Sequence, residues 1–115
     1  MFGLKNSFKG LVNMFRTERN FKVQIAILCL TIALGLYLHL SSAEWLIIIL
    51  VSILVLSLEA LNSAVEKFCD FVHIEEHDKI KWIKDVAAGA VLIACIGAVI
   101  IGGIIFIPRL IVLFS

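Results

Sequence analysis

Charged and amide side chains enter a long apolar segment in the middle of the chain. The run from Trp45 to Leu58 is broken only by Ser52 and Ser57, and Glu59 follows it directly. A membrane-spanning helix needs about 20 apolar residues, at about 1.5 Å each, to cross about 30 Å of hydrocarbon. Because this run covers only about 21 Å, Glu59 is predicted to lie inside the membrane boundary, where an ionisable group is costly and is a candidate for function.

Further polar residues continue the pattern that Glu59 begins. Asn62, Glu66 and Asp70 follow it at intervals of three or four residues. In a helix these four positions share one stripe. A single buried carboxylate can simply pair with a lysine on a neighbouring helix, but four polar residues in register favour a functional site.

The composition indicates a small integral membrane protein. The chain has 115 residues, of which 62% are hydrophobic and 17% charged, a balance too apolar for a soluble domain of this size. A formal net charge of +1 gives no reason to expect a nucleic-acid partner. The cysteines at positions 29, 69 and 95 are too scattered to predict a disulfide framework or a zinc site. No removable signal peptide is expected, because charges run through the N-terminal stretch.

We therefore expect a single all-α membrane domain over residues 1–115. It comprises an N-terminal amphipathic surface helix and three transmembrane helices. The surface helix follows from aromatic residues such as Phe8 and Phe15 alternating with basic ones at helical spacing. The expected ranges are about 2–16 for the surface helix and about 22–40, 45–71 and 85–107 for the spans.

Small residues in the third span suggest close helix packing. One occurs at every fourth position from Ala90 to Gly102, a pattern that lets another helix approach closely in a membrane. With only three spans available to shield the polar stripe, an oligomer is favoured. Pro108 is expected to end the third span.

The distribution of basic residues predicts the orientation. Lysine and arginine are frequent before residue 22 and in the expected connection 72–84, but the connection from Ser41 to Glu44 contains neither. The positive-inside rule therefore places the N-terminus and the 72–84 connection in the cytoplasm. The C-terminus then lies outside, where Arg109 is a mild exception.

Two kinds of motif bear on catalysis. His73 to His77 fits the H-x-x-E-H pattern of zinc proteases, but such a site needs a stable helix and a third ligand in a soluble cleft. The chain contains no glycine-rich phosphate loop. A nucleotide would therefore have to be held by lysines and carboxylate-bound magnesium, a cation that prefers oxygen ligands. Candidates near the predicted cytoplasmic surface are Glu18, Glu66, Asp70, Lys84 and Asp85.

Two stretches, residues 59–66 with Asp70 and residues 84–92, resemble the signature of the small prokaryotic diacylglycerol kinase family. Residues 17–21 and 85–92 are more similar to the undecaprenol kinases of Gram-positive bacteria within that family. The resemblance extends from about Ser7 to Ile107. It implies a homotrimer in the bacterial cytoplasmic membrane, with active sites between neighbouring chains at the cytoplasmic face.

The resemblance also implies roles for individual residues. Glu59 matches the catalytic base and Asn62 the asparagine that orders the site, while Glu18 and Glu66 match the ligands of Mg²⁺. The role of Asp70 stays open. The residues matched to ATP binding are Ser7, Lys9, Glu18, Glu66, Glu75, Glu76, His77, Lys84 and Asp85.

The expected function is an ATP-dependent lipid kinase that phosphorylates the primary hydroxyl of undecaprenol to give undecaprenyl phosphate. A diacylglycerol kinase that makes phosphatidic acid is the nearest alternative, because its substrate presents the same hydroxyl at the same depth. A small proton-coupled transporter component, with Glu59 as a proton carrier, is the alternative from another class. Such a transporter should have carboxylates accessible from both sides of the membrane, whereas the strong candidates here lie at one end.

Overall fold

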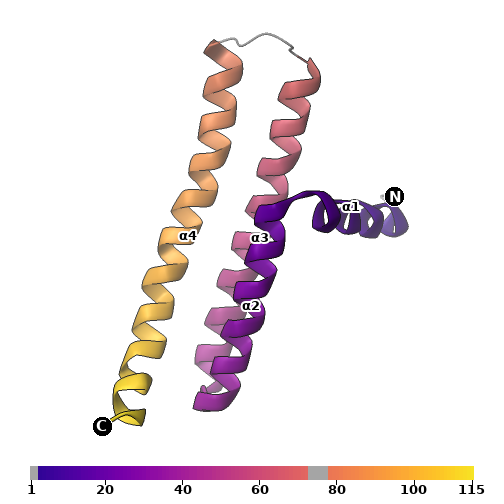
Figure 1. Ribbon diagram of the computed structural model, residues 1–115. Helices are drawn as coiled ribbons and strands as arrows, with labels where there is room; N and C mark the ends of the chain where they lie inside the picture. The colour runs from indigo at the N-terminus through magenta and orange to yellow at the C-terminus, as the bar shows by residue number, and fades with distance from the viewer. Residues whose placement is uncertain (1–2, 73–77) are drawn as a thin grey trace.

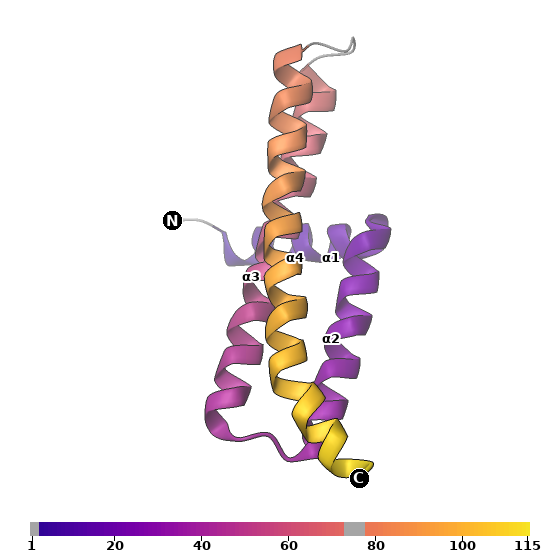
Figure 2. The same cartoon turned by 90° about the vertical axis from the view of Figure 1, so that its left-hand side faces the viewer.

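The computed structural model describes residues 3–72 and 78–115, which form four helices. Helix α1 (Leu4–Thr17) lies crosswise to the other three, α2 (Arg19–Leu38), α3 (Ser42–Val72) and α4 (Asp78–Leu113), which run alongside one another (Figures 1 and 2). Helix α3 packs chiefly against α4, and α2 packs against the half of α3 nearer to their connection. The ends of α1, α2 and α3 differ from the expected ranges by at most three residues.

Helices α2, α3 and α4 are each long and apolar enough to cross a membrane, which confirms the all-α membrane class. A helix is suited to hydrocarbon because it satisfies its backbone hydrogen bonds internally. With 31 and 36 residues, α3 and α4 are about 46 and 54 Å long, well beyond the hydrocarbon thickness of about 30 Å. Both therefore extend past the membrane, and Figure 1 shows them rising together beyond α1.

Helix α4 is longer at both ends than expected. Residues 78–84, expected in a polar connection, form its first two turns. Pro108 lies inside the helix, which continues to Leu113, so the prediction that Pro108 ends the helix is wrong. Proline removes one backbone hydrogen bond, but membrane helices tolerate this loss where neighbouring elements support them. Here α4 bends near its yellow end (Figure 2), and the adjacent Arg109 is held by residues of α2 and α3.

A tight corner joins α2 to α3. His39 adopts the left-handed conformation, with φ 57° and ψ 59°, and the Leu40 N–H donates to the Gly35 carbonyl at 3.3 Å. The Ser41 N–H donates to Glu44 Oε1 at 2.9 Å, and the Glu44 N–H donates to Ser41 Oγ at 3.2 Å. This reciprocal capping box satisfies backbone donors at the start of α3, so the direction of the helix is set within a few residues.

Arg109 ties α4 to this corner. Its Nε donates to Glu44 Oε2 at 3.2 Å, its Nη2 pairs with Glu44 Oε1, and its Nη1 donates to the carbonyl oxygens of Leu38 and His39. Glu44 precedes the apolar run that begins at Trp45, and the Arg109 guanidinium lowers the pKa of the Glu44 carboxyl from 4.5 to about 2. The pair is therefore ionised at neutral pH. Arg109, the exception to the positive-inside rule, is neutralised by Glu44 of the same chain.

Gly35 allows α2 to approach α3 closely. A Cβ added at Gly35 would lie 2.7 Å from Cη2 of Trp45 and 3.0 Å from Cδ1 of Leu40. The Trp45 ring is rigid and packs against the buried cluster of Leu40, Ile48 and Ile105. It cannot give way without disturbing that cluster.

Gly35→Ala is expected to lower the free energy of unfolding by about 1–3 kcal/mol, the usual cost of overpacking, although alanine is the better helix former. Gly10→Ala on α1 is the matched control, since a Cβ there meets nothing within 4 Å, and it should leave stability equal or higher. Thermal unfolding in detergent micelles, followed by circular dichroism, compares the two. Equal midpoints would contradict the close packing at the corner.

Candidate active site

Helix α3 carries the four polar residues on one continuous stripe, as the sequence predicts. Their exposure increases along the helix. The Glu59 residue is buried, with 6% of its surface exposed, and Asn62 and Glu66 are half-buried. Asp70 is exposed, with 67% of its side-chain surface accessible. The stripe therefore leads from the apolar interior to the extended end of α3.

Glu59 is held from the neighbouring helix by an amide. Nε2 of Gln24, on α2, donates to Glu59 Oε2 at 3.2 Å. The carboxylates of Glu66 and Glu18 lie near enough to Glu59 to repel its charge, so three acidic groups from two parts of the chain share this region. Among the described residues, Gln24 is the one hydrogen-bond partner of the Glu59 carboxylate.

A second amide–carboxylate pair lies one turn further along α3. Asn62 Nδ2 donates to Glu66 Oε1 at 3.3 Å. In both pairs the amide nitrogen donates a hydrogen bond to the carboxylate, while the amide oxygen has no partner. Among the buried side-chain nitrogen and oxygen atoms of the described residues, Gln24 Oε1 and Asn62 Oδ1 are the two without a hydrogen-bond partner. Buried acceptors are usually satisfied, so these two oxygens are available to accept a hydrogen bond from a ligand.

Glu18 reaches the same region from the break between α1 and α2. It is the one residue between the two helices, and its backbone is extended, with φ −101° and ψ 111°. Its Oε1 lies 3.8 Å from Nζ of Lys67 on α3. Such a long, exposed ion pair contributes little to stability, so Glu18 can exchange this lysine for another cation at small cost.

Two ion pairs occupy the extended ends of α3 and α4. Lys84 Nζ lies 3.0 Å from Asp70 Oδ1, and Lys81 Nζ lies 2.8 Å from Asp85 Oδ2. Lys84 precedes the apolar part of α4, and the hydrogen bond to Asp70 raises the pKa of its ammonium group. The contact of Asp70, whose role the sequence leaves open, is therefore a cross-helix ion pair to Lys84.

The structure does not bring every predicted site residue together. Ser7 and Lys9 are exposed on α1, which is directed away from α4 (Figure 1), and Ser7 Oγ donates to the Gly3 carbonyl oxygen within its own helix. Glu75, Glu76 and His77 lie outside the described residues, as does the whole H-x-x-E-H motif. Residues 3–72 and 78–115 contain no cluster of three or more His, Cys, Asp or Glu suited to a metal.

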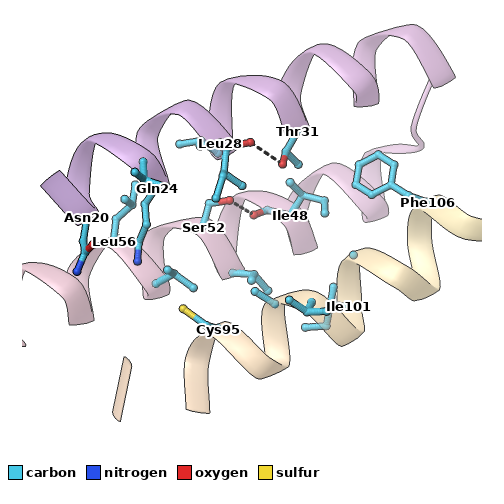
Figure 3. A pocket seen from close by; sticks show the side chains of 17 residues that line it. Asn20, Gln24, Leu28, Thr31, Ile48, Ser52, Leu56, Cys95, Ile101 and Phe106 are labelled. Carbon is cyan, nitrogen blue, oxygen red and sulfur yellow. Dashed lines mark hydrogen bonds between the residues drawn. The ribbon is translucent and has the colours of Figure 1, made fainter. Parts of the chain in front are cut away.

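An apolar cavity of about 500 Å³ lies between α2, α3 and α4. Asn20 and Gln24 line it at one end, and Phe106 lies toward the other (Figure 3). The hydroxyls of Thr31 and Ser52 also face this region, but each donates to a carbonyl oxygen of its own helix at 2.8 Å. The polar groups still available are thus concentrated at the end where Gln24 contacts Glu59.

Sequence reasoning missed Gln24 and the cavity. The signal for Gln24 was present, because an amide inside an apolar run is as unusual as the carboxylate that singled out Glu59. Gln24 lies near the start of the first span, and the sequence alone does not show that this position is at the same height in the bundle as Glu59. The cavity has no sequence signature, because it is formed by three helices that meet only in the fold.

Known proteins match nearly the whole chain. The family model for prokaryotic diacylglycerol kinase matches residues 5–106. Undecaprenol kinase of Bacillus subtilis is 40% identical over 102 residues, covering 89% of this chain and 83% of that protein. A diacylglycerol kinase of Haemophilus influenzae is 36% identical over 103 residues, covering 89% and 87%. One from Synechocystis is 37% identical over 111 residues, covering 96% of this chain and 63% of that longer protein.

The family match includes α2 and α3 in full, most of α1 and α4, and all the described candidate residues. This agrees with the resemblance seen in the sequence. The chain belongs to the prokaryotic diacylglycerol kinase family and is a membrane lipid kinase.

Proposed function

We propose that this lipid kinase transfers the γ-phosphoryl group of ATP to the primary hydroxyl of undecaprenol, with Glu59 as the general base. The observation that carries the proposal is a buried carboxylate bound by Gln24, which lines the polar end of an apolar cavity. A lipid alcohol has its hydroxyl beside the hydrocarbon and its tail within it, so its base must lie at the same depth. Glu59 meets this requirement, and it accepts the hydroxyl proton as the oxygen attacks phosphorus.

The cavity supports a substrate with few polar groups besides the hydroxyl. The first units of a prenyl tail can lie along its apolar wall, while the rest of the tail extends into the lipid. Diacylglycerol brings two ester carbonyls, which need donors, yet the Thr31 and Ser52 hydroxyls are already committed to their own helices. The similarity to a protein named undecaprenol kinase points the same way. Diacylglycerol remains the second candidate, because other relatives bear that name. Family membership favours both over a proton-coupled transporter.

The acidic residues near Glu59 fit Mg²⁺. This cation is usually held by one or two carboxylates together with substrate phosphates, and Glu18 and Glu66 provide two. The open Asn62 Oδ1 beside Glu66 is a further hard oxygen donor. Bound there with the nucleotide, the metal would neutralise phosphate charge. The hydrogen bond from Asn62 would keep the Glu66 carboxylate oriented, and this contact supports the ordering role proposed for Asn62.

Lys84 and Asp85 are proposed to contact ATP at the extended ends of α3 and α4. Phosphate oxygens would replace Asp70 as the partner of the Lys84 ammonium, since both are anionic acceptors. Ser7, Lys9, Glu75, Glu76 and His77 are proposed to complete the nucleotide site. Because α1 is directed away from α4 in one chain (Figure 1), a neighbouring chain would have to bring Ser7 and Lys9 to Lys84.

This need for a second chain supports the homotrimer implied by the family resemblance. Helix α4 also presents Gly97, at which an added Cβ meets nothing within 4 Å in this chain, so there is room for another helix beside it. Helix α1 leaves Phe8 and Phe15 exposed, which suits a surface helix in the membrane interface. We place the N-terminus and the active site at the cytoplasmic face of the bacterial plasma membrane and the C-terminus outside.

The substrate assignment is tested with a panel of lipid alcohols in mixed micelles containing labelled ATP and magnesium. Undecaprenol should be phosphorylated with a kcat/KM about tenfold above that of diacylglycerol, which corresponds to about 1.4 kcal/mol and is the order expected for ester carbonyls left without donors. A preference for diacylglycerol would replace the undecaprenol assignment. No transfer to any lipid alcohol would overturn the proposed reaction.

Glu59→Gln is expected to lower kcat by about 10²–10⁴-fold, the usual contribution of a general base. The amide keeps the size of the side chain, so gel filtration should give the wild-type elution volume. Glu44→Gln is the matched control at the opposite end of α3 and should keep its phosphotransfer activity. Wild-type turnover in the Glu59 variant would remove Glu59 as the base.

Variants of the Lys84–Asp70 pair test whether Lys84 binds the nucleotide or only joins α3 to α4. Lys84→Met should raise the KM for ATP by about 10–100-fold, because a charge-assisted hydrogen bond is worth about 1.5–3 kcal/mol. Asp70→Asn should change that KM less, because it leaves the ammonium group in place. The double variant Asp70→Lys/Lys84→Asp restores the ion pair but not the position of the cation. A wild-type KM for ATP in the double variant would show that the pair serves only to join the helices.

A further inference from the structure

We propose that Gln24 is a positioning residue for phosphoryl transfer, which orients the Glu59 carboxylate toward the lipid hydroxyl. This inference rests on the proposed function, because it assumes that Glu59 is the base. It adds a residue of α2 to a site otherwise built from α3, the α1–α2 break and the start of α4.

The contact is specific and crosses between helices. Gln24 Nε2 donates to Glu59 Oε2 at 3.2 Å, although the two residues are 35 positions apart. Glu59 itself is 6% exposed, so water has little access to replace the amide. In the described part of the chain, the carboxylate has no ion pair and no other hydrogen bond. Gln24 therefore determines how the carboxylate is turned about its side-chain axis.

The orientation of the Glu59 carboxylate matters for proton transfer. A base must have one oxygen within hydrogen-bond reach of the hydroxyl it deprotonates. Because Gln24 engages Oε2, the orientation of Oε1 is set as well, and Oε1 stays available for the substrate. A misplacement of about 1 Å in such an arrangement can cost about 10²-fold in rate. An amide donor suits this task better than a lysine would, because it orients the carboxylate without neutralising it.

The other end of the same amide faces the substrate side. Gln24 Oε1 is buried and has no partner among the described residues, and Gln24 lines the apolar cavity. A lipid hydroxyl that enters at this end finds two acceptors close together, the Gln24 oxygen and the Glu59 carboxylate. The amide thus borders the place where the hydroxyl must sit.

Three variants test the inference in the full-length protein. Gln24→Met keeps the length of the side chain but removes the donor, and it should lower kcat for the lipid alcohol by about 10–100-fold. The KM for ATP and the elution volume should not change, while the unfolding midpoint should fall slightly because a buried carboxylate loses its hydrogen-bond donor. Gln24→His returns an N–H donor and should restore part of kcat. Adding Gln24→Met to Glu59→Gln should cost no further activity, because residues that act as a unit are not additive.

The outcomes separate this inference from the proposed function. Wild-type kcat in Gln24→Met, with Glu59→Gln inactive, would overturn the role of Gln24 and leave the base in place. Equal loss of kcat, ATP affinity and assembly in both Gln24→Met and Gln24→His would reduce Gln24 to a structural contact. A wild-type protein that phosphorylates no lipid alcohol, or an active Glu59→Gln variant, would instead remove the proposed function.

Discussion

The structure depends on how a carboxylate is accommodated inside an apolar helix. At membrane depth an ionised side chain costs several kcal/mol unless it meets a partner. Helix α3 carries four acids, and their partners differ with depth. Glu66, which is half-buried, accepts a hydrogen bond from the amide of Asn62. Glu44 is paired with an arginine, Asp70 with a lysine, and the buried Glu59 with the amide of Gln24. Glu59, the most buried of the four, is held without being neutralised, which suits the proposed base, because a carboxylate tightly paired with a cation is a poor proton acceptor.

The two ends of the helical bundle also differ in how their charged side chains are paired. At the α2–α3 corner, Gly35 allows Trp45 to pack closely, and Arg109 joins Glu44 to the carbonyl oxygens that end α2. At the other end, the contacts between helices are exposed ion pairs such as Lys84–Asp70. Exposed pairs contribute little to stability. The corner therefore holds the helices together, while the end that carries the candidate nucleotide residues can change partners at small cost.

The polar groups of the candidate site lie in two kinds of surroundings, one buried among apolar residues and one exposed to water. Gln24 lines an apolar cavity and binds the buried Glu59, so these two side chains form their hydrogen bond within the protein. Glu18 and Lys84 form ion pairs with exposed partners, Lys67 and Asp70, where water can compete for the contact. A lipid alcohol and a polyphosphate need these opposite surroundings, and the polar stripe of α3 runs from one to the other in a single helix. Asn62 and Glu66 stand at the boundary, half-buried, where a phosphoryl group would have to pass.

Much of this was determined by the sequence alone. Hydropathy and a helical period are local properties, so the three apolar helices and the register of the four polar residues on α3 could be predicted without a fold. The end assigned to Pro108 was wrong, because a local rule was applied where Arg109 and the neighbouring helices support the chain. Gln24 with Glu59 and Glu44 with Arg109 were missed, since each pair is separated by 35 or 65 residues. Only the relative rotation and depth of whole helices, set by their packing, brings such residues into contact.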